Sequence, residues 1–246
     1  MQTKEATFMS QRGSWITILD IVLATFTCAA ALAVIGGVVS DPPRVAASEN
    51  RKEGKILPPT ARPHGYSLSE IAKITAVFNS GDHSGPPPVT SFQILYTSKT
   101  NNNTFDVGPD TMFYVPVIFF DDSPPIAGDF PFAFFNNTED RDDTGDRKAL
   151  LHYVFSGDEL GVDSMEIKVD DKVFSLGPDY VVGVTTPPLA DGGGTHYIPF
   201  AAFLTPLTKG THTVEIDGNS YGKALIPFFP PNGVWEFTIV YTVNVH

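Results

Sequence analysis

WEFTIVYTVNV, at residues 235–245, alternates apolar and polar side chains along most of its length. Successive residues of a β-strand point to opposite faces of its sheet, so this alternation predicts a strand with one buried and one wet face. It is the best-defined strand of the chain and favours a mainly β fold. The apolar positions are Trp235, Phe237, Ile239, Tyr241, Val243 and Val245.

Shorter strand patterns precede this terminal strand, and each is bounded by turn residues. Asp170-Asp171 lies between two of them and predicts a two-residue hairpin turn. Pro116 lies inside another, and because proline cannot donate to a strand ladder, it indicates an edge strand or a bulge. The predicted strands are residues 92–96, 112–120, 165–169, 172–176, 196–204 and 212–217.

Helices are few in this sequence. Ser67 and Glu70 form a capping box at the start of an apolar helical pattern that runs to Phe78. A second short helix is expected over 148–155. The 21 prolines disfavour a helical bundle, because proline lacks a backbone donor and breaks helices. The predicted fold is therefore an antiparallel β-sandwich, Ig-like or of the jelly-roll type, with one or two short helices.

Residues 204–214, LTPLTKGTHTV, carry a Pro-Leu-x-x-Gly-x-His-Thr-Val turn followed by the long terminal strand. This C-terminal pattern resembles the closing hairpin of Ig-like β-sandwiches in secreted bacterial proteins, many of them from uncharacterised families. The resemblance covers about the last 50 residues and implies a fold, without chemistry.

An apolar run of about 25 residues, Trp15 to Val39, is long enough to span a bilayer as a hydrophobic helix. Lys4 and Arg12 precede it, and this polarity predicts export of the remainder. The segment is either a cleaved signal peptide or a single transmembrane anchor, which is how the chain would meet a membrane. The predicted organisation is residues 1–40 as this segment, 41–63 as a flexible linker and 64–246 as one β-sandwich domain, secreted, periplasmic or on the cell surface.

Charge and cysteine content restrict the exported part. The net charge of −12 repels phosphate backbones, which argues against nucleic acid as a partner. Cys28 is the only cysteine and lies in the hydrophobic segment, so the exported part has no disulfide, thiolate metal site or cysteine nucleophile. Divalent cations or neutral ligands, such as an extracellular glycan or a protein, are the more natural partners.

An acidic loop at residues 136–148, NNTEDRDDTGDRK, is a candidate Ca²⁺ site. Its oxygen ligands have a spacing like the start of an EF-hand loop, but position twelve is Leu151 where a bidentate Glu belongs. The alternative is a solvated charged loop. Calcium is the only cofactor that the sequence suggests, and the candidate ligands are Asp140, Asp142, Thr144 and Asp146.

A second candidate site is the glycine-rich loop DGGGTH, from Asp191 to His196. Asp191 and His196 could form a general base with its orienting carboxylate, or a metal pair. Asp121 and Asp122 end an apolar strand, where binding residues often lie. The alternative for the glycine-rich loop is an ordinary loop with a histidine at a strand edge, and the alternative for Asp121 and Asp122 is a turn.

No convergent set of catalytic motifs is present, which favours an exported non-catalytic protein with a structural or binding role at the cell envelope. The alternative is an extracellular hydrolase or lyase that acts on a glycan through paired carboxylates such as Asp121, Asp122 or Asp191. Two carboxylates facing each other across a deep cleft would favour the enzyme.

Overall fold

The computed structural model describes residues 54–97, 102–136 and 145–246. The chain separates into two compact units, residues 1–51 and 52–246, and the fold below is that of the second. The predicted N-terminal hydrophobic helix lies outside the described residues. No helix within them has both the length and the apolar character needed to cross a bilayer.

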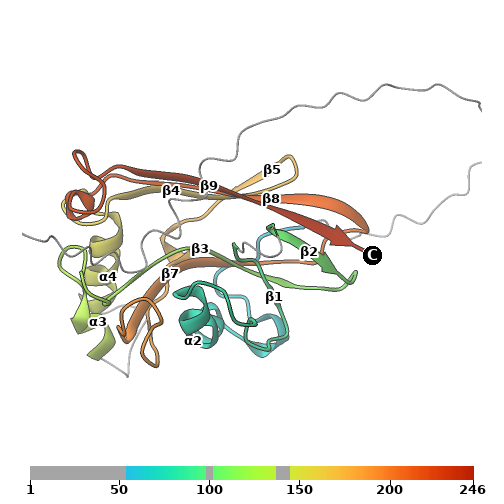
Figure 1. Cartoon of the computed structure of the whole chain (residues 1–246), viewed down its shortest axis with the longest axis horizontal. Coiled ribbons are helices and arrows are strands. Elements are labelled where there is room, and N and C mark those ends of the chain that lie inside the picture. The colour runs from blue at the N-terminus through green and yellow to red at the C-terminus, as the bar shows by residue number, and fades with distance from the viewer. Residues whose placement is uncertain (1–53, 98–101, 137–144) are drawn as a thin grey trace, which may run out of the picture. The chain divides into compact units, whose positions relative to one another are not determined.

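Two packed β-sheets make up the domain, which confirms a mainly β fold consistent with a sandwich (Figure 1). The first, sheet A, has the order β1 (Gln93–Ile94), β3 (Phe113–Asp121), β7 (His196–Leu204), β6 (Val184–Thr185). The second, sheet B, has the order β2 (Thr104–Val107), β9 (Trp235–Val245), β8 (Gly210–Ser220), β4 (Val162–Val169), β5 (Lys172–Ser175).

The expectation of purely antiparallel sheets is wrong, because both sheets are mixed. β1 pairs in parallel with β3, and β2 pairs in parallel with β9. Between β1 and β3 the chain passes through β2 in the other sheet, so β1 and β3 run in the same direction. Each parallel pair involves a short strand at the edge of its sheet.

The terminal strand β9 has the predicted alternation. It pairs with β8 over eleven residues, from Gly210 opposite Val245 to Ser220 opposite Trp235. Segment 205–209 does not close a hairpin, because it carries the chain from β7 in sheet A to β8 in sheet B. The hairpin turn is instead the longer segment 221–234. The core between the sheets includes Phe113, Val115, Ile167, Phe200, Ala202, Val214, Ile216, Tyr241 and Val243.

Other local predictions are confirmed. Asp170, with a φ of 52°, sits in the turn between β4 and β5. β3 is bulged between Pro116 and Ile118 but lies inside sheet A rather than at its edge. The helix after Ser67 is α2 (Leu68–Asn79), and its capping box with Glu70 is formed.

Helices cover parts of sheet A and one end of the sandwich. α2 packs Leu68 and Ile71 against Tyr114 and Phe203 of the sheet. α3 (Phe132–Asn136) and α4 (Gly145–Phe155) contact each other at the end of the sandwich (Figure 1). Three 3-10 turns complete the elements: η1 (Pro63–Gly65), η2 (Pro178–Tyr180) and η3 (Lys223–Leu225).

The described chain enters the sandwich at one end. Leu57 donates its N–H to the carbonyl oxygen of Phe203 at 2.9 Å, and Thr205 donates its N–H to that of Lys55 at 3.0 Å. Residues 55–57 therefore pair antiparallel with the C-terminal end of β7. The folded unit thus begins within the predicted linker, before residue 64. We call this the entry end, and we call the opposite end the loop end, which consists of residues 122–136 (including α3), 156–161, 186–195 and 221–234.

Candidate functional site: the aspartate cluster at the loop end

Three of the predicted carboxylates meet where β3 ends beside the start of β7. Asp121 is the last residue of β3 and lies opposite Tyr197 of β7. The glycine-rich loop 186–195 connects β6 to β7 and folds over the segment after Asp121. Asp122, Asp191 and His196 are thereby brought to one place, which sequence spacing alone did not show.

Asp122 binds His196, and Asp191 does not. The Asp122 Oδ2 atom lies 2.6 Å from Nδ1 of His196, and its Oδ1 accepts the N–H groups of Thr195 at 2.7 Å and His196 at 2.8 Å. Burial raises the pKa of Asp122, but these hydrogen bonds outweigh it and leave the pKa below its ordinary value. The carboxylate therefore fixes the imidazole with Nδ1 toward the protein.

Aromatic rings surround the other side of His196. The ring of Phe135 lies 4.6 Å from the imidazole between centroids, that of Phe132 5.6 Å and that of Phe130 6.3 Å. Within the described ranges of the chain, no hydrogen-bond partner faces Nε2 of His196. The side chain of His196 is 22% exposed, and Nδ1 is the ring nitrogen that Asp122 engages.

Asp121 and Asp191 form a separate pair. A hydrogen bond links the carboxyl groups of Asp121 and Asp191, and such a bond requires that one of the two carries a proton. Burial raises the pKa of Asp121 to about 7, repulsion from Asp191 adds to the rise, and hydrogen bonds from Ser123 oppose it. Ser123 joins the two, because its N–H donates to Asp121 at 2.7 Å and its hydroxyl donates to Asp191 at 2.9 Å.

The triple glycine has a packing reason. A Cβ on Gly194 would lie 2.5 Å from Oδ1 of Asp122 and 2.6 Å from the Ser123 nitrogen, closer than real Cβ atoms come. A Cβ on Gly192 would lie 2.7 Å from the Cβ of Ser123. Gly193 between them has a φ of +81°, which favours glycine. The loop can approach Asp122 and Ser123 only because side chains are missing.

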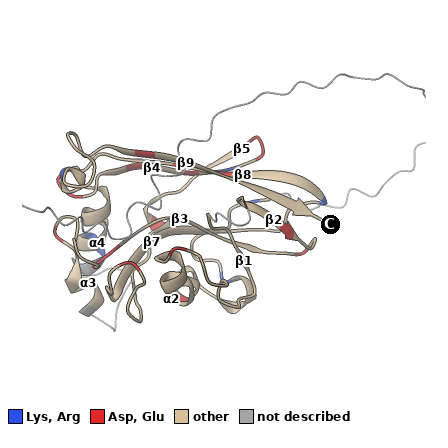
Figure 2. Ribbon diagram, viewed as in Figure 1, with Lys and Arg blue, Asp and Glu red and all other residues tan. Residues whose placement is uncertain are grey.

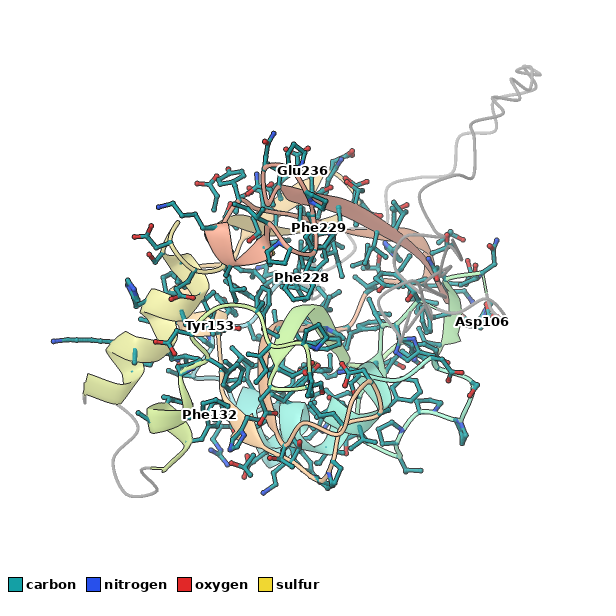
Figure 3. The ribbon with its side chains drawn as sticks, turned by 60° about the vertical axis from the view of Figure 1, so that its left-hand side comes forward. Asp106, Phe132, Tyr153, Phe228, Phe229 and Glu236 are labelled. Atoms are coloured by element: carbon teal, nitrogen blue, oxygen red, sulfur yellow. The ribbon has the colours of Figure 1, made fainter. Side chains whose placement is uncertain are left out.

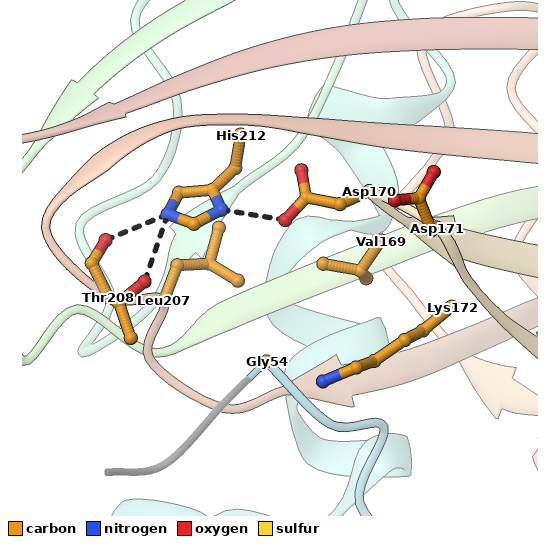
Figure 4. A pocket seen from close by; sticks show the side chains of 8 residues that line it. All are labelled: Gly54, Val169, Asp170, Asp171, Lys172, Leu207, Thr208 and His212. Atoms are coloured by element: carbon orange, nitrogen blue, oxygen red, sulfur yellow. Dashed lines mark hydrogen bonds and ion pairs between the residues drawn. The ribbon is translucent and has the colours of Figure 1, made fainter.

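A second aspartate–histidine pair lies at the entry end (Figure 4). Asp170 Oδ2 lies 2.9 Å from Nδ1 of His212, and Oδ1 accepts the N–H of Thr213 at 3.0 Å. The Nε2 atom of His212 lies 2.8 Å from the carbonyl oxygen of Thr208. A hollow of about 220 Å³ borders this pair, lined also by Gly54, Val169, Asp171, Lys172 and Leu207. Both ring nitrogens of His212 are engaged, so its side chain connects the β4–β5 turn at Asp170 to the segment at Thr208.

Exposed apolar side chains gather at the loop end, which Figure 3 brings forward with Phe132, Phe228 and Phe229 labelled. The loops that carry most of them touch, because Gly128 approaches Ala224 and Glu159 closely, and Ala224 donates its N–H to Glu159. Five large apolar residues of this end are 39–43% exposed: Ile126, Phe132, Tyr221, Ile226 and Val234.

Acidic side chains accompany this apolar surface. Figure 2 shows many Asp and Glu and few Lys or Arg on the domain. Exposed acids in or beside the loop-end loops are Asp129, Asp158, Asp163 and Glu236. Lys223, a cation of the same loops, is paired with Asp158 at 2.5 Å. The loop end is therefore apolar with an acidic rim.

The predicted calcium ligands Asp140, Asp142 and Thr144 lie outside the described residues. Asp146 lies in the first turn of α4. Among the described residues, no group of three His, Cys, Asp or Glu side chains could hold a metal ion. Sequence reasoning missed Ser123 and the three phenylalanines around His196. The run FPFAFF at residues 130–135, directly before α3 and within it, was the available signal for the phenylalanines.

No family model and no curated protein matches the chain. A crystal structure of a cysteine protease inhibitor from Entamoeba histolytica aligns with 14% identity, 63% of this chain and 96% of that one, at a TM-score of 0.28. The solution structure of Amebosin aligns with 15% identity, 66% of this chain and all of that one, at a TM-score of 0.22. Likenesses this distant carry no argument about function.

Proposed function

We propose that the chain is an exported, non-catalytic binding module of Ig-like type that recognises a protein partner through its loop end. The observation that carries the proposal is the gathering of partly exposed apolar residues, with an acidic rim, at the end of the sandwich away from chain entry. Contiguous exposed apolar surface on a folded domain commonly marks an interaction site. The partner chemistry that fits is an apolar surface with basic residues around it.

The position of the loop end suits a tethered domain. β7 runs from His196 at the loop end to Leu204 at the entry end, and a strand rises about 3.3 Å per residue, so the two ends are roughly 25–30 Å apart. The described part of the domain begins at Gly54 at the entry end, so the loop end is the part of this domain that lies farthest from that residue.

The carboxylate geometry supports a non-catalytic role over the glycan hydrolase or lyase. Glycosidases hold their two carboxyl groups about 5 Å or more apart, to leave room for the scissile bond. Asp121 and Asp191 share a hydrogen bond instead, and Asp122 is fully engaged by His196 and two backbone N–H groups. Asp121, Asp122 and Asp191 thus form interactions that hold loop 186–195 against the end of β3. Calcium binding by residues 140–146 remains a separate proposal.

Site-specific photo-crosslinking in cells tests the binding role. A photoreactive residue is placed at Ile226 or Phe132 of the full chain, and the matched controls are Val240 and Val173, which are exposed apolar residues outside the loop end. We expect a discrete adduct from the loop-end positions and none from the controls, with loss of the Phe132 adduct when Ile226→Asp is added. Equal adducts from all four positions, or an adduct from Val240 alone, would contradict the proposal.

A further inference from the structure

We propose that Asp121, Ser123 and Asp191 form a proton-dependent latch that holds loop 186–195 against the end of β3. The latch goes beyond the proposed function. Its operation does not depend on that function, although any effect on partner binding would rest on it.

The latch consists of two interactions of the Asp191 carboxylate, one with Asp121 and one with Ser123. Ser123 bridges the two carboxyl groups, because its hydroxyl donates to Asp191 at 2.9 Å and its N–H donates to Asp121 at 2.7 Å, and a hydrogen bond that needs one shared proton links the carboxyl groups to each other. The same hydroxyl accepts the N–H of Gly194 at 3.1 Å. The middle of the loop is thus attached to the end of β3 and the segment after it through two side chains, those of Asp121 and Ser123.

One of these bonds exists only while a proton is shared. Two carboxylates at hydrogen-bond distance cannot both ionise without strong repulsion, as in aspartic protease dyads. The titratable neighbours of the pair are Asp122 from the same segment, His196 and Tyr197 from β7, and Tyr153 from α4. No cation is among the described groups that shift the pKa of Asp121. Loss of the proton therefore leaves uncompensated negative charge in a partly buried place.

A second clasp keeps the C-terminal end of the loop in place. Asp122 holds Thr195 and His196 by its ionised oxygens, and its pKa is lowered, so this clasp persists where the latch fails. The loop is consequently expected to open between residues 187 and 194 and to stay attached at Thr195. The loop also contacts α2 and its C-cap, because Leu189 packs with Ala72 and Ala76 and Ala190 donates its N–H to Ser80, and opening between residues 187 and 194 would break these contacts together with the latch.

The direction of the pH effect follows from linkage. The pKa of Asp121 is raised to about 7 when the loop is closed and returns toward its ordinary value near 3.8 when the loop is open. Opening therefore releases a proton between these values, and the opening equilibrium rises by up to about tenfold per pH unit. Above about pH 7 both states are ionised and the dependence levels off.

Amide hydrogen exchange of the full-length protein in detergent, at pH values from 5 to 8 and corrected for intrinsic rates, tests the latch. The reporters are loop amides bonded in the closed state, namely Leu189 to Gly194, Gly193 to Leu189 and Ala190 to Ser80. We expect their protection to fall steadily from pH 5 to 7 and then to stay constant. Protection that is flat across this range would overturn the proposal.

Variants separate the latch from general loosening. Asp121→Asn retains a hydrogen-bond donor to Asp191 without the titration, so the pH dependence should disappear, and Asp191→Asn provides a second variant with the same expectation. Ser123→Ala should lower protection at every pH and keep the slope. Asp110→Asn, at an exposed turn, is the control that should behave as the wild type. An unchanged slope in folded Asp121→Asn and Asp191→Asn would also overturn it.

Discussion

The two aspartate–histidine pairs at opposite ends of the sandwich share one local geometry and differ in what surrounds it. In each, an aspartate accepts a backbone N–H from the neighbouring strand and binds Nδ1 of a histidine. Nε2 of His212 is bonded to Thr208, whereas Nε2 of His196 has no hydrogen bond to a described residue and the ring of Phe135 packs 4.6 Å from the imidazole. The same pair is therefore a closed structural link at the entry end and a partly open group at the loop end.

The second difference is how the aspartate is supported. Asp170 stands in a two-residue turn and its side chain is 47% exposed, while the side chain of Asp122 is 11% exposed beneath a glycine-rich loop. Water can replace lost hydrogen bonds at the first site but not at the second. Burial, rather than the hydrogen-bond pattern, should therefore decide how much each pair contributes to stability.

The largest effect is expected from Gly194→Val, which places side-chain atoms where Asp122 and Ser123 now lie. Overpacking of this kind costs about 3 kcal/mol, and it should be measured as a lower free energy of unfolding in denaturant. Gly157→Ala is the control, because a Cβ there meets nothing within 4 Å. Equal losses in the two variants would mean that loop 186–195 is not held closely over Asp122.

A smaller, unequal effect is expected from Asp122→Asn and Asp170→Asn. Removing a buried charge-assisted acceptor costs about 2 kcal/mol, and an exposed one about 1 kcal/mol or less. Thermal melts at pH 7 measure the difference. Both aspartates have lowered pKa values when folded, so their contribution is present above about pH 4 and is lost as the pH falls through the folded pKa. Equal losses of stability in the two variants at pH 7 would show that burial does not decide how much each aspartate contributes.

The smallest effect concerns reactivity and leaves stability unchanged. Diethylpyrocarbonate modifies an unbonded imidazole nitrogen, so His196 should be labelled several-fold faster than His212, whose two ring nitrogens are both engaged. Mass spectrometry of the two peptides gives the rates from one sample. Faster labelling of His212 would show that its bonds to Asp170 and Thr208 do not persist in solution.

Local patterns in the sequence predicted local structure well. The alternation in β9, the capping box of α2 and the Asp170 turn each depend on neighbouring residues and were all found. The parallel pairings of β1 and β2 could not be predicted, because they depend on which sheet the chain visits between strands. The PLxxG segment was misread for the same reason, since a turn between sheets and a turn within a hairpin use similar residues.

The site was predicted as a set of residues but not as an arrangement. Asp121, Asp122, Asp191 and His196 were all candidates, yet the histidine binds Asp122 and the acid at 191 binds Asp121. Which carboxylate meets the imidazole depends on the register between β3 and β7, where Asp121 lies opposite Tyr197. A shift of one residue would turn each of these side chains to the other face of the sheet, and residue spacing does not report register.

The attachment of residues 55–57 to the end of β7 has a mechanical consequence. Two backbone hydrogen bonds, between Leu57 and Phe203 and between Thr205 and Lys55, lie across the strand direction, and the N–H of Lys55 donates a third to the hydroxyl of Thr205. A pull on Gly54 along the strands, against a partner held at the loop end, would load these bonds together in shear rather than one after the other. The domain would then transmit tension along its long strands, with the first rupture at the entry end.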